Sequence, residues 1–316
     1  TSPMMGLPTN PYQSVEILAY KNKFRKFLKK NGFNCPDAQG FSHYTLLEKS
    51  MRYFTFPVIA KPVDSSGSKG VSKVDSPDKL KQAFDCAMQH SRCKQVIIET
   101  FINRTHPYFV GGDCFVLNRK VAFWGLLNSH RASNDNPLIP TGNSFPVLMS
   151  EDKIKLCKAT VQRMVDLLPI HFGGLNLEMI FDKQGNVFSI EMGSRNGGNM
   201  IPDFLHMITG VDMISATIET ALGNNTITLA GYHPKGYFAT YNIHSAKKGI
   251  LQEIVFTPAI EKNIIKKVFY KRKGDLVDCF DGANRALGIV FMRFDTMEQL
   301  MDRMDHMEKW IKVKVK

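Results

Sequence analysis

Residues 176–191 combine two apolar runs with a polar turn between them, and this pattern predicts a β-hairpin. We place the centre of the turn between Gln184 and Gly185. Counting outward along both strands then puts Glu178 directly opposite Glu191. Opposed side chains in a sheet lie about 5 Å apart, and like charges at that distance destabilise the sheet. The hairpin therefore calls for a compensating cation beside this pair.

Two carboxylates at this separation suit Mg²⁺, a hard cation that prefers oxygen ligands. Arg195 follows four residues after Glu191, inside the glycine-rich run 193–199. Carboxylates, an arginine and a glycine-rich turn together predict a place where a metal and phosphates meet. The alternative is that both glutamates lie on a solvated face, and a loop one residue longer or shorter would separate the pair.

A second motif begins with residues 56–62, a short apolar strand that ends at a proline, which cannot continue a central ladder. The following segment, 64–70, is rich in Ser and Gly, and residues 71–74 read as a returning strand. Small residues let backbone N–H groups form an anion-binding concavity, to which Lys69 adds a donor. Lys61 would reach the same anion from the strand end. The alternative is an ordinary flexible turn.

Together these motifs resemble the ATP-grasp superfamily, in particular the branch of biotin carboxylase, the carbamoyl-phosphate synthetase large subunit and related carboxylate–amine ligases. The resemblance runs from about Tyr20 to Gly223, with four motifs in the family's order. It implies an α+β (α/β) ATP-grasp fold, in which two α+β lobes clasp ATP beside a small C-terminal α+β lobe. It also implies ATP and Mg²⁺ (or Mn²⁺) as cofactors.

The resemblance assigns a role to each motif. Lys21 and Lys61 match the lysines that hold ATP phosphates, and Arg195 matches the arginine that steadies the transferred group. Glu178 and Glu191 match the metal carboxylates. The flap over the phosphates matches Ser65, Ser66, Gly67, Ser68, Lys69 and Gly70, and the adenine-binding strand and hinge match Glu99, Thr100, Phe101 and Ile102.

Three features depart from the family pattern. Gly193 stands where an asparagine commonly follows the second carboxylate, which leaves Asn199 as a candidate for a third metal or phosphate contact. The nearest match to the ribose-binding glutamate is Asp113, at a long spacing from the hinge. We expect the family's usual N-terminal domain to be largely absent, which leaves open whether the sequence is a fragment.

Turn and capping signals divide the chain further. We expect a helical N-terminal segment (1–55), a lid (56–102), a core with the metal site (103–230) and a C-terminal lobe (231–316). A single helix is predicted from residue 11 to residue 30, and others near 76–88, 150–169, 202–222 with a break at Gly210, and 296–310. Strands are expected at 114–117, 121–127, 237–243 and 288–294, with an alternating tail at 312–315.

Residues 128–142 read as a long polar loop that carries His130 and Arg131 where the family branch approaches its acyl acceptor. The alternative for His130 is a solvated surface histidine. Both interpretations stay open on the sequence alone.

Composition excludes several classes of protein. No apolar run is long enough to span a bilayer, and no signal peptide is apparent. Six scattered cysteines without a C-x-x-C pair indicate a reduced, cytoplasmic protein without a zinc site. The net charge of +12 admits nucleic-acid binding, but a phosphate-binding cleft with a solvated basic surface explains it as well. A homo-oligomer is left open.

The resulting expectation is an ATP-dependent ligase that joins a small-molecule carboxylate to an amine through an acyl phosphate, releasing ADP and phosphate. One alternative is an enzyme of the carbamoyl-phosphate synthetase or biotin carboxylase kind that activates bicarbonate. A second alternative is a non-catalytic relative that only binds the nucleotide. The acid and the amine are not identified by any motif in the sequence.

Overall fold

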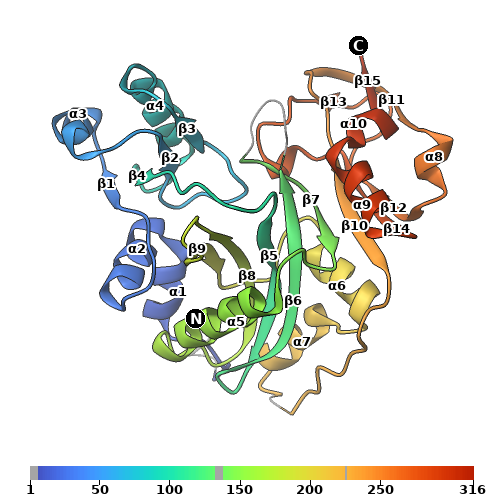
Figure 1. The fold of residues 1–316 in the computed structure, drawn as a ribbon, viewed down its shortest axis with the longest axis horizontal. Helices are drawn as coiled ribbons and strands as arrows, with labels where there is room; N and C mark the ends of the chain where they lie inside the picture. The colour runs from blue at the N-terminus through green and yellow to red at the C-terminus, as the bar shows by residue number, and fades with distance from the viewer. Residues whose placement is uncertain (1–5, 132–137, 225) are drawn as a thin grey trace.

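Three β-sheets organise the chain in the computed structural model, which describes residues 6–131, 138–224 and 226–316. They contain four, eight and three strands, and only the largest crosses the middle of the molecule (Figure 1). Helices pack beside the sheets along the chain, so the structure belongs to the mixed α+β class, as expected.

The four-stranded sheet forms the lid, at the upper left of Figure 1, in the order β1-β4-β2-β3. Apolar side chains of its strands pack against α4 and α3 in a core of their own. The predicted strand, turn, strand, helix and strand are present, and β1 with α3 adds to them. The lid elements are β1 (Ala38–Phe41), α3 (Tyr44–Ser50), η2 (Met51–Tyr53), β2 (Val58–Pro62), β3 (Ser72–Val74), η3 (Pro77–Lys79), α4 (Leu80–His90) and β4 (Val96–Thr100).

The eight-stranded sheet is antiparallel in every pairing that its strands make, in the order β12-β14-β10-β7-β6-β5-β8-β9. It therefore joins the core of the molecule to its C-terminal part. Its strands are β5 (Phe109–Leu117), β6 (Lys120–Arg131), β7 (Pro140–Phe145), β8 (Gly173–Phe181), β9 (Val187–Gly193), β10 (Tyr237–Ile243), β12 (Ile264–Phe269) and β14 (Gly288–Phe294).

Both faces of this sheet are covered, because neighbouring residues of a strand point to opposite sides. Cys114 of β5 lies in a core with α2 and α5, whereas Phe115 lies in a second core with α6 and α7. These helices are α2 (Lys21–Lys30), α5 (Glu151–Leu167), α6 (Ile201–Thr209) and α7 (Met213–Ala221). The break between α6 and α7 falls at Gly210, as predicted, where φ is +77°.

The N-terminal helix and the long polar loop differ from their predicted extents. The helix expected over 11–30 is split into α1 (Tyr12–Ala19) and α2, because Tyr20 is extended and the Lys21 N–H donates to the Val63 carbonyl at the end of β2. The long loop expected over 128–142 is also wrong at both ends. β6 continues to Arg131 and β7 begins at Pro140, and residues 132–137 lie outside the described part of the chain.

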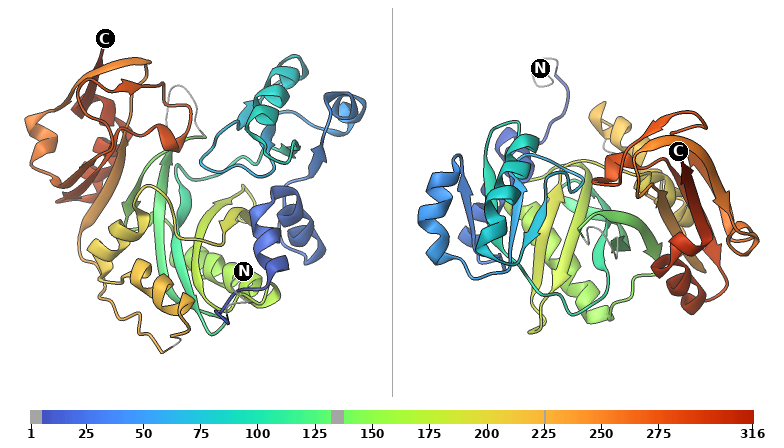
Figure 2. Two further views of the ribbon diagram at one scale, coloured as in Figure 1. Left: turned by 180° about the vertical axis from the view of Figure 1, so that it is seen from behind. Right: turned by 90° about the horizontal axis from the view of Figure 1, so that it is seen from above.

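The C-terminal part packs a three-stranded sheet, ordered β13-β11-β15, and three helices into one core with β10 and β14. The helix expected over 296–310 is interrupted at His306. The elements are β11 (Gly249–Phe256), α8 (Pro258–Glu261), β13 (Leu276–Val277), η4 (Ala283–Arg285), α9 (Met297–Asp305), α10 (Met307–Trp310) and β15 (Ile311–Val315). Figure 2 shows this part and the lid at opposite ends of the molecule. In the described residues, no helix is both long and apolar enough to cross a membrane.

Candidate active site

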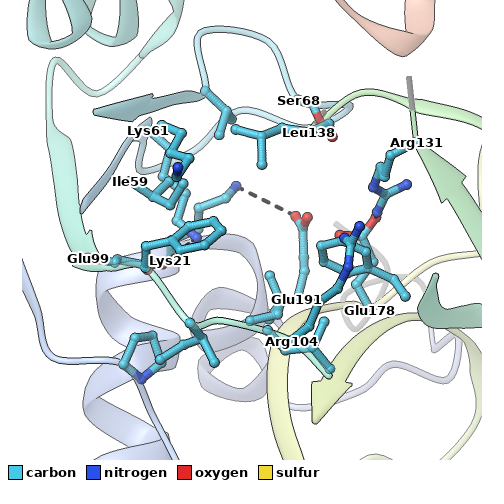
Figure 3. A pocket seen from close by; sticks show the side chains of 18 of the residues that line it. Lys21, Ile59, Lys61, Ser68, Glu99, Arg104, Arg131, Leu138, Glu178 and Glu191 are labelled. Carbon is cyan, nitrogen blue, oxygen red and sulfur yellow. Dashed lines mark hydrogen bonds and ion pairs between the residues drawn. The ribbon is translucent and has the colours of Figure 1, made fainter. Parts of the chain in front are cut away.

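A cavity of about 300 Å³ lies between the lid and the hairpin of β8 and β9. Most residues predicted from the sequence line it: Lys21, Lys61, 65–69, 99–102, Arg131, Glu178 and Glu191. Figure 3 shows the charged side chains converging on this space from the lid, from α2 and from the large sheet. Among the residues that the structure describes, the lining does not include Gly70, Asp113, His130, Arg195 or Asn199.

Glu178 and Glu191 are direct partners across β8 and β9, as the hairpin pattern predicts. The path to this pairing differs from the predicted one. Phe181 pairs with Val187, one residue away from the predicted register, and Ile190 is an extra residue that forms a β-bulge. A bulge places two residues opposite one, so it shifts the register back and brings the two glutamates together.

Each of these carboxylates faces a cation. Lys21 Nζ lies 3.5 Å from Glu191 Oε1, and Arg131 Nη2 donates to Glu178 Oε1 at 2.8 Å. Burial would raise the pKa of the Glu191 carboxyl, but the surrounding positive charges, led by Lys21, hold that pKa below its ordinary value. Glu191 is therefore ionised at neutral pH and able to bind a cation.

The carboxylate pair fits Mg²⁺ as a site completed by phosphate. The described residues contain no cluster of three or more His, Cys, Asp or Glu able to hold a metal without help. Mg²⁺ is usually held by one or two carboxylates together with phosphate oxygens and water. Glu178 and Glu191 can supply two such carboxylates, because their side chains line the cavity and are 28% and 35% exposed.

Behind the cavity, Lys61 belongs to a buried network that the sequence analysis missed. Its ammonium lies 2.5 Å from Glu99 Oε2, and Arg25 Nε lies 2.9 Å from Glu99 Oε1. All three side chains are less than a tenth exposed. Burial would raise the pKa of Glu99, but Arg25 and Lys61 keep it low. Burial, with the charges of Arg25 and Lys21, lowers the pKa of Lys61 despite the opposing charge of Glu99.

Arg25 was detectable from the sequence by its spacing. It follows Lys21 by four residues, so both project from the same face of α2. Its guanidinium also donates to the carbonyl oxygens of Ser189 and Ile190 in β9. One buried arginine thus connects the helix of Lys21, the strand of Glu191 and the carboxylate that holds Lys61.

The Ser- and Gly-rich segment 65–70 forms a tight loop over the cavity. Gly67 and Gly70 have φ values of +67° and +69°, which glycine adopts without strain, whereas Ser68 has a φ of +61°, which is uncommon for residues other than glycine. Lys21 Nζ donates to the Ser65 carbonyl, and the Ser68 hydroxyl donates to the Leu138 carbonyl at 2.8 Å. The loop therefore contacts both α2 and the large sheet.

The same loop also touches the C-terminal part of the chain. The Ala283 N–H donates to the Gly67 carbonyl at 3.2 Å. A Cβ atom added at Gly282 would lie 3.1 Å from Lys69 Cγ. More than two hundred residues separate these segments along the chain, and sequence reasoning gave no signal for the contact.

The apolar walls of the cavity were also missed. Ile59 lines it from the lid, and Ile180 and Ile190 line it from the hairpin of β8 and β9. Ile59 is the strand partner of Glu99, where the segment 99–102 begins. Ile59 precedes Lys61 by two residues and Ile180 follows Glu178 by two, the period that marks one side of a strand. Ile190 lacks this signal because it is the bulge residue next to Glu191.

Asp113 and His130 occupy interior positions. Asp113 is fully buried and accepts hydrogen bonds from the Gly197 N–H at 2.7 Å and from Asn176 Nδ2 at 2.8 Å. This arrangement holds the glycine-rich run, and burial raises the pKa of Asp113 to about 6. His130 is 2% exposed, lies on β6 and has its Nε2 2.8 Å from the Ser144 hydroxyl oxygen. It is not the solvated histidine of one interpretation.

Arg195 and Asn199 lie in the loop after β9. Arg195 is exposed and donates to the neighbouring Asn196 carbonyl at 2.9 Å. Its positive charge is one of those that lower the pKa of Glu191. Asn199 and Met200 have left-handed backbone conformations with φ of +51° and +56°, and α6 begins directly after them.

Known proteins resemble this chain in sequence. Residues 23–107 match the family described as D-ala D-ala ligase C-terminus. The chain is 24% identical over 218 residues to the carbamoyl phosphate synthase large chain of Thermotoga neapolitana, a match that covers 68% of this chain. The chain spans only 19% of the length of that relative.

Solved structures match over almost the whole chain. The L-amino acid ligase of Bacillus licheniformis superposes with a TM-score of 0.80 at 20% identity, covering 100% of this chain and 76% of that one. The biotin carboxylase domain of the Hydrogenobacter thermophilus 2-oxoglutarate carboxylase, solved with MgADP, ADP and bicarbonate, gives a TM-score of 0.71 at 16% identity. That match covers 97% of this chain and 69% of the other. Residues 23–107 therefore match one ligase family model, and nearly the whole chain has the ATP-grasp fold that the sequence predicts.

Proposed function

We propose that this chain is an ATP-dependent carboxylate–amine ligase, which works through an acyl phosphate and releases ADP and phosphate. The observation that carries the proposal is the pairing of Glu178 with Glu191 at a cavity that Lys21 and Lys61 also line. Two solved structures that share the fold of this chain support the proposal. One is an L-amino acid ligase, and the other is a biotin carboxylase domain that holds MgADP.

Lys21, Lys61 and the loop 65–70 would bind and orient the triphosphate. The lysines supply positive charge from α2 and β2, and the loop supplies backbone N–H donors from above. Glu178 and Glu191 would hold Mg²⁺ or Mn²⁺, which when bound offsets the charge of the β- and γ-phosphates. The base would lie between Ile59 and the isoleucines of the hairpin, beside the hinge 99–102.

The carboxylate of the acid would attack the γ-phosphorus in line, and ADP would leave. An amine would then add to the acyl carbon and expel phosphate, and a proton would be lost from the amine nitrogen. Arg195 would stabilise negative charge on the transferred group through its N–H donors. A closed loop 65–70 would exclude water, which otherwise hydrolyses the acyl phosphate.

The test is a screen for ADP release over pairs of carboxylic acids and amines with MgATP. We expect release that depends on both partners, and its loss in Glu191→Ala without loss of folding by circular dichroism. Glu253→Ala is the matched control, because Glu253 is an exposed, ion-paired glutamate on β11, away from the cavity. Normal turnover of Glu191→Ala would remove the metal assignment.

A bicarbonate arm in the same screen tests a second candidate function. It is favoured by the solved relative whose structure contains bicarbonate with MgADP. ADP release with bicarbonate and no organic acid would replace the carboxylate–amine reaction by bicarbonate activation. Tight MgATP binding without release under any condition would indicate a nucleotide-binding protein instead of a ligase.

A further inference from the structure

Arg104 is a cation of the cavity wall to which the proposed ATP site gives no role. It lies two residues after the hinge 99–102 and lines the cavity. Each carboxylate of the lining already lies within ion-pair distance of a cation: Glu99 of Lys61, Glu178 of Arg131, and Glu191 of Lys21. Of the lining cations in the described chain, Lys69 and Arg104 have no acidic partner. Lys69 belongs to the loop over the triphosphate, which leaves Arg104.

Arg104 and Arg131 share one aromatic ring. Their guanidinium carbons lie 5.0 Å and 4.4 Å from the centre of the Phe109 ring. Stacking on a ring fixes the plane of a guanidinium and leaves its N–H edge available to an anion. Burial and the neighbouring charge of Arg131 both lower the pKa of Arg104, as expected for two cations held close together.

Arg131 is built into the wall and still has an unused donor. Its side chain is 4% exposed, with Nη2 bonded to Glu178 and Nη1 to the Ser129 hydroxyl at 2.9 Å. Its Nε is buried without a hydrogen-bond partner. A guanidinium has five N–H donors, so Nη1 and Nη2 of Arg131 each keep one N–H group beyond the two hydrogen bonds named above, and an anion in the cavity can accept from these.

The cluster stands apart from the cations assigned to the triphosphate. Figure 3 shows Lys21 and Lys61 on one side of Glu191, and Arg104 and Arg131 on the other side, next to Glu178. An anion held there would lie beside the carboxylate pair, where the γ-phosphate is proposed to sit. This is the place from which an acid could reach the phosphorus.

We propose that Arg104 and Arg131 form an oxyanion subsite that takes the carboxylate of the acid substrate. The planar fork of a guanidinium matches the two oxygens of a carboxylate, and Arg104 supplies the positive charge that Arg131 shares with Glu178. The identity of the bound group as an acid substrate rests on the proposed ligase function. The oxyanion site itself does not, because a phosphate oxygen would satisfy the same donors.

The first test is chemical protection of Arg104 without turnover. Phenylglyoxal modifies accessible arginines, and mass spectrometry measures the rate at each residue. With saturating MgADP, we expect acetate to slow modification of Arg104 relative to chloride at equal ionic strength. Arg52 is the internal control, because it is an exposed arginine stacked on the Tyr53 ring at 4.8 Å and does not line the cavity. Equal effects of acetate at Arg104 and Arg52 would overturn the subsite.

A second measurement separates the acid from the nucleotide as the source of the oxyanion. Arg104→Met should bind MgADP and MgATP within about twofold of the original protein by calorimetry, a negligible free-energy change. Once an acid is known, its KM should rise about tenfold, which corresponds to roughly 1.4 kcal/mol of lost binding. A tenfold loss of MgATP affinity, or full protection of Arg104 by nucleotide alone, would overturn the assignment to the acid.

These results are distinguishable from failure of the ligase proposal. If no acid–amine pair yields ADP but acetate still protects Arg104, the oxyanion subsite stands and the proposed reaction is wrong. If turnover is found and Arg104→Met leaves the KM of the acid unchanged, the reaction stands and the subsite is wrong. Arg52→Met serves as the matched variant in both measurements.

Discussion

Arg25 donates a hydrogen bond of 2.8 Å to the carbonyl oxygen of Ile190, the residue that forms the bulge in β9. The bulge is what aligns Glu191 with Glu178, so a helix residue supports the geometry of the carboxylate pair. The same guanidinium faces Glu99, which in turn holds Lys61. The buried arginine therefore positions groups on three elements at once.

Arg25→Met should destabilise the protein by about 3–5 kcal/mol, because it removes one partner of a buried ion network. It should also weaken MgATP binding, since the bulge and Lys61 both lose support. Arg25→Lys keeps the charge but not the fork, and should recover only part of the stability. Urea unfolding and calorimetry measure the two effects. Unchanged stability of Arg25→Met would contradict a structural role for the network.

Gly282→Val should weaken MgATP binding with little change in the free energy of unfolding. Its backbone is extended, with φ of −173°, so a side chain there creates no backbone strain. The side chain would instead press on Asn284 Oδ1, 2.9 Å from the added Cβ, and on Lys69 and the Gly67 carbonyl of the loop over the cavity. Gly40→Val is the control, because a Cβ at Gly40 meets nothing closer than 3.9 Å. Equal affinities in both variants would show that the contact does not position the loop.

His130 should make the protein less stable as the pH falls. Burial, with the charge of Arg131, lowers its pKa to about 3, so the folded protein keeps it neutral where the unfolded chain protonates it near pH 6.5. The stability that it contributes is present above pH 6.5 and is lost progressively below it. At pH 5 the loss is about 2 kcal/mol by proton linkage. Urea unfolding of His130→Gln at pH 7.5 and pH 5 should show a correspondingly smaller decrease than the original protein.

Asp113→Ala should destabilise the glycine-rich run without acting on ribose. Removing the carboxylate leaves the Gly197 N–H without its acceptor, at a cost of about 1–3 kcal/mol, while Asn176 Nδ2 keeps only its 3.2 Å hydrogen bond to the Gly112 carbonyl. The affinity for MgADP should fall only as far as the loss of folded protein explains. If Asp113 instead contacted the ribose, its removal would weaken the binding of ADP selectively. Comparing affinities for ADP and for inorganic pyrophosphate separates these outcomes. A loss confined to ADP would restore the ribose assignment.

Local patterns predicted much of the site because its motifs are short in sequence. The opposition of Glu178 and Glu191 follows from one hairpin, and the loop 65–70 follows from its small residues. The predicted pairing in the hairpin is correct because two deviations in register cancel. The strand register next to the turn differs from the predicted register by one residue, and the bulge at Ile190 restores it.

Contacts between distant segments were not predictable in the same way. Arg25 is four residues from Lys21, but its acceptors at Ser189 and Ile190 lie across the fold. The extension of β6 to Arg131 contradicts the polar composition there, because pairing with β5 and β7 satisfies the backbone and buries His130. Tertiary packing overrode local composition at these positions.

The most direct test of the account is the position of a divalent ion relative to the paired glutamates. A crystal structure with Mn²⁺ and ADP locates the ion by its anomalous scattering. We predict a peak within coordination distance, roughly 2.0–2.6 Å, of carboxylate oxygens from both Glu178 and Glu191, with phosphate oxygens completing the site. A peak bound by neither glutamate, with the nucleotide ordered in the cavity, would contradict the central claim.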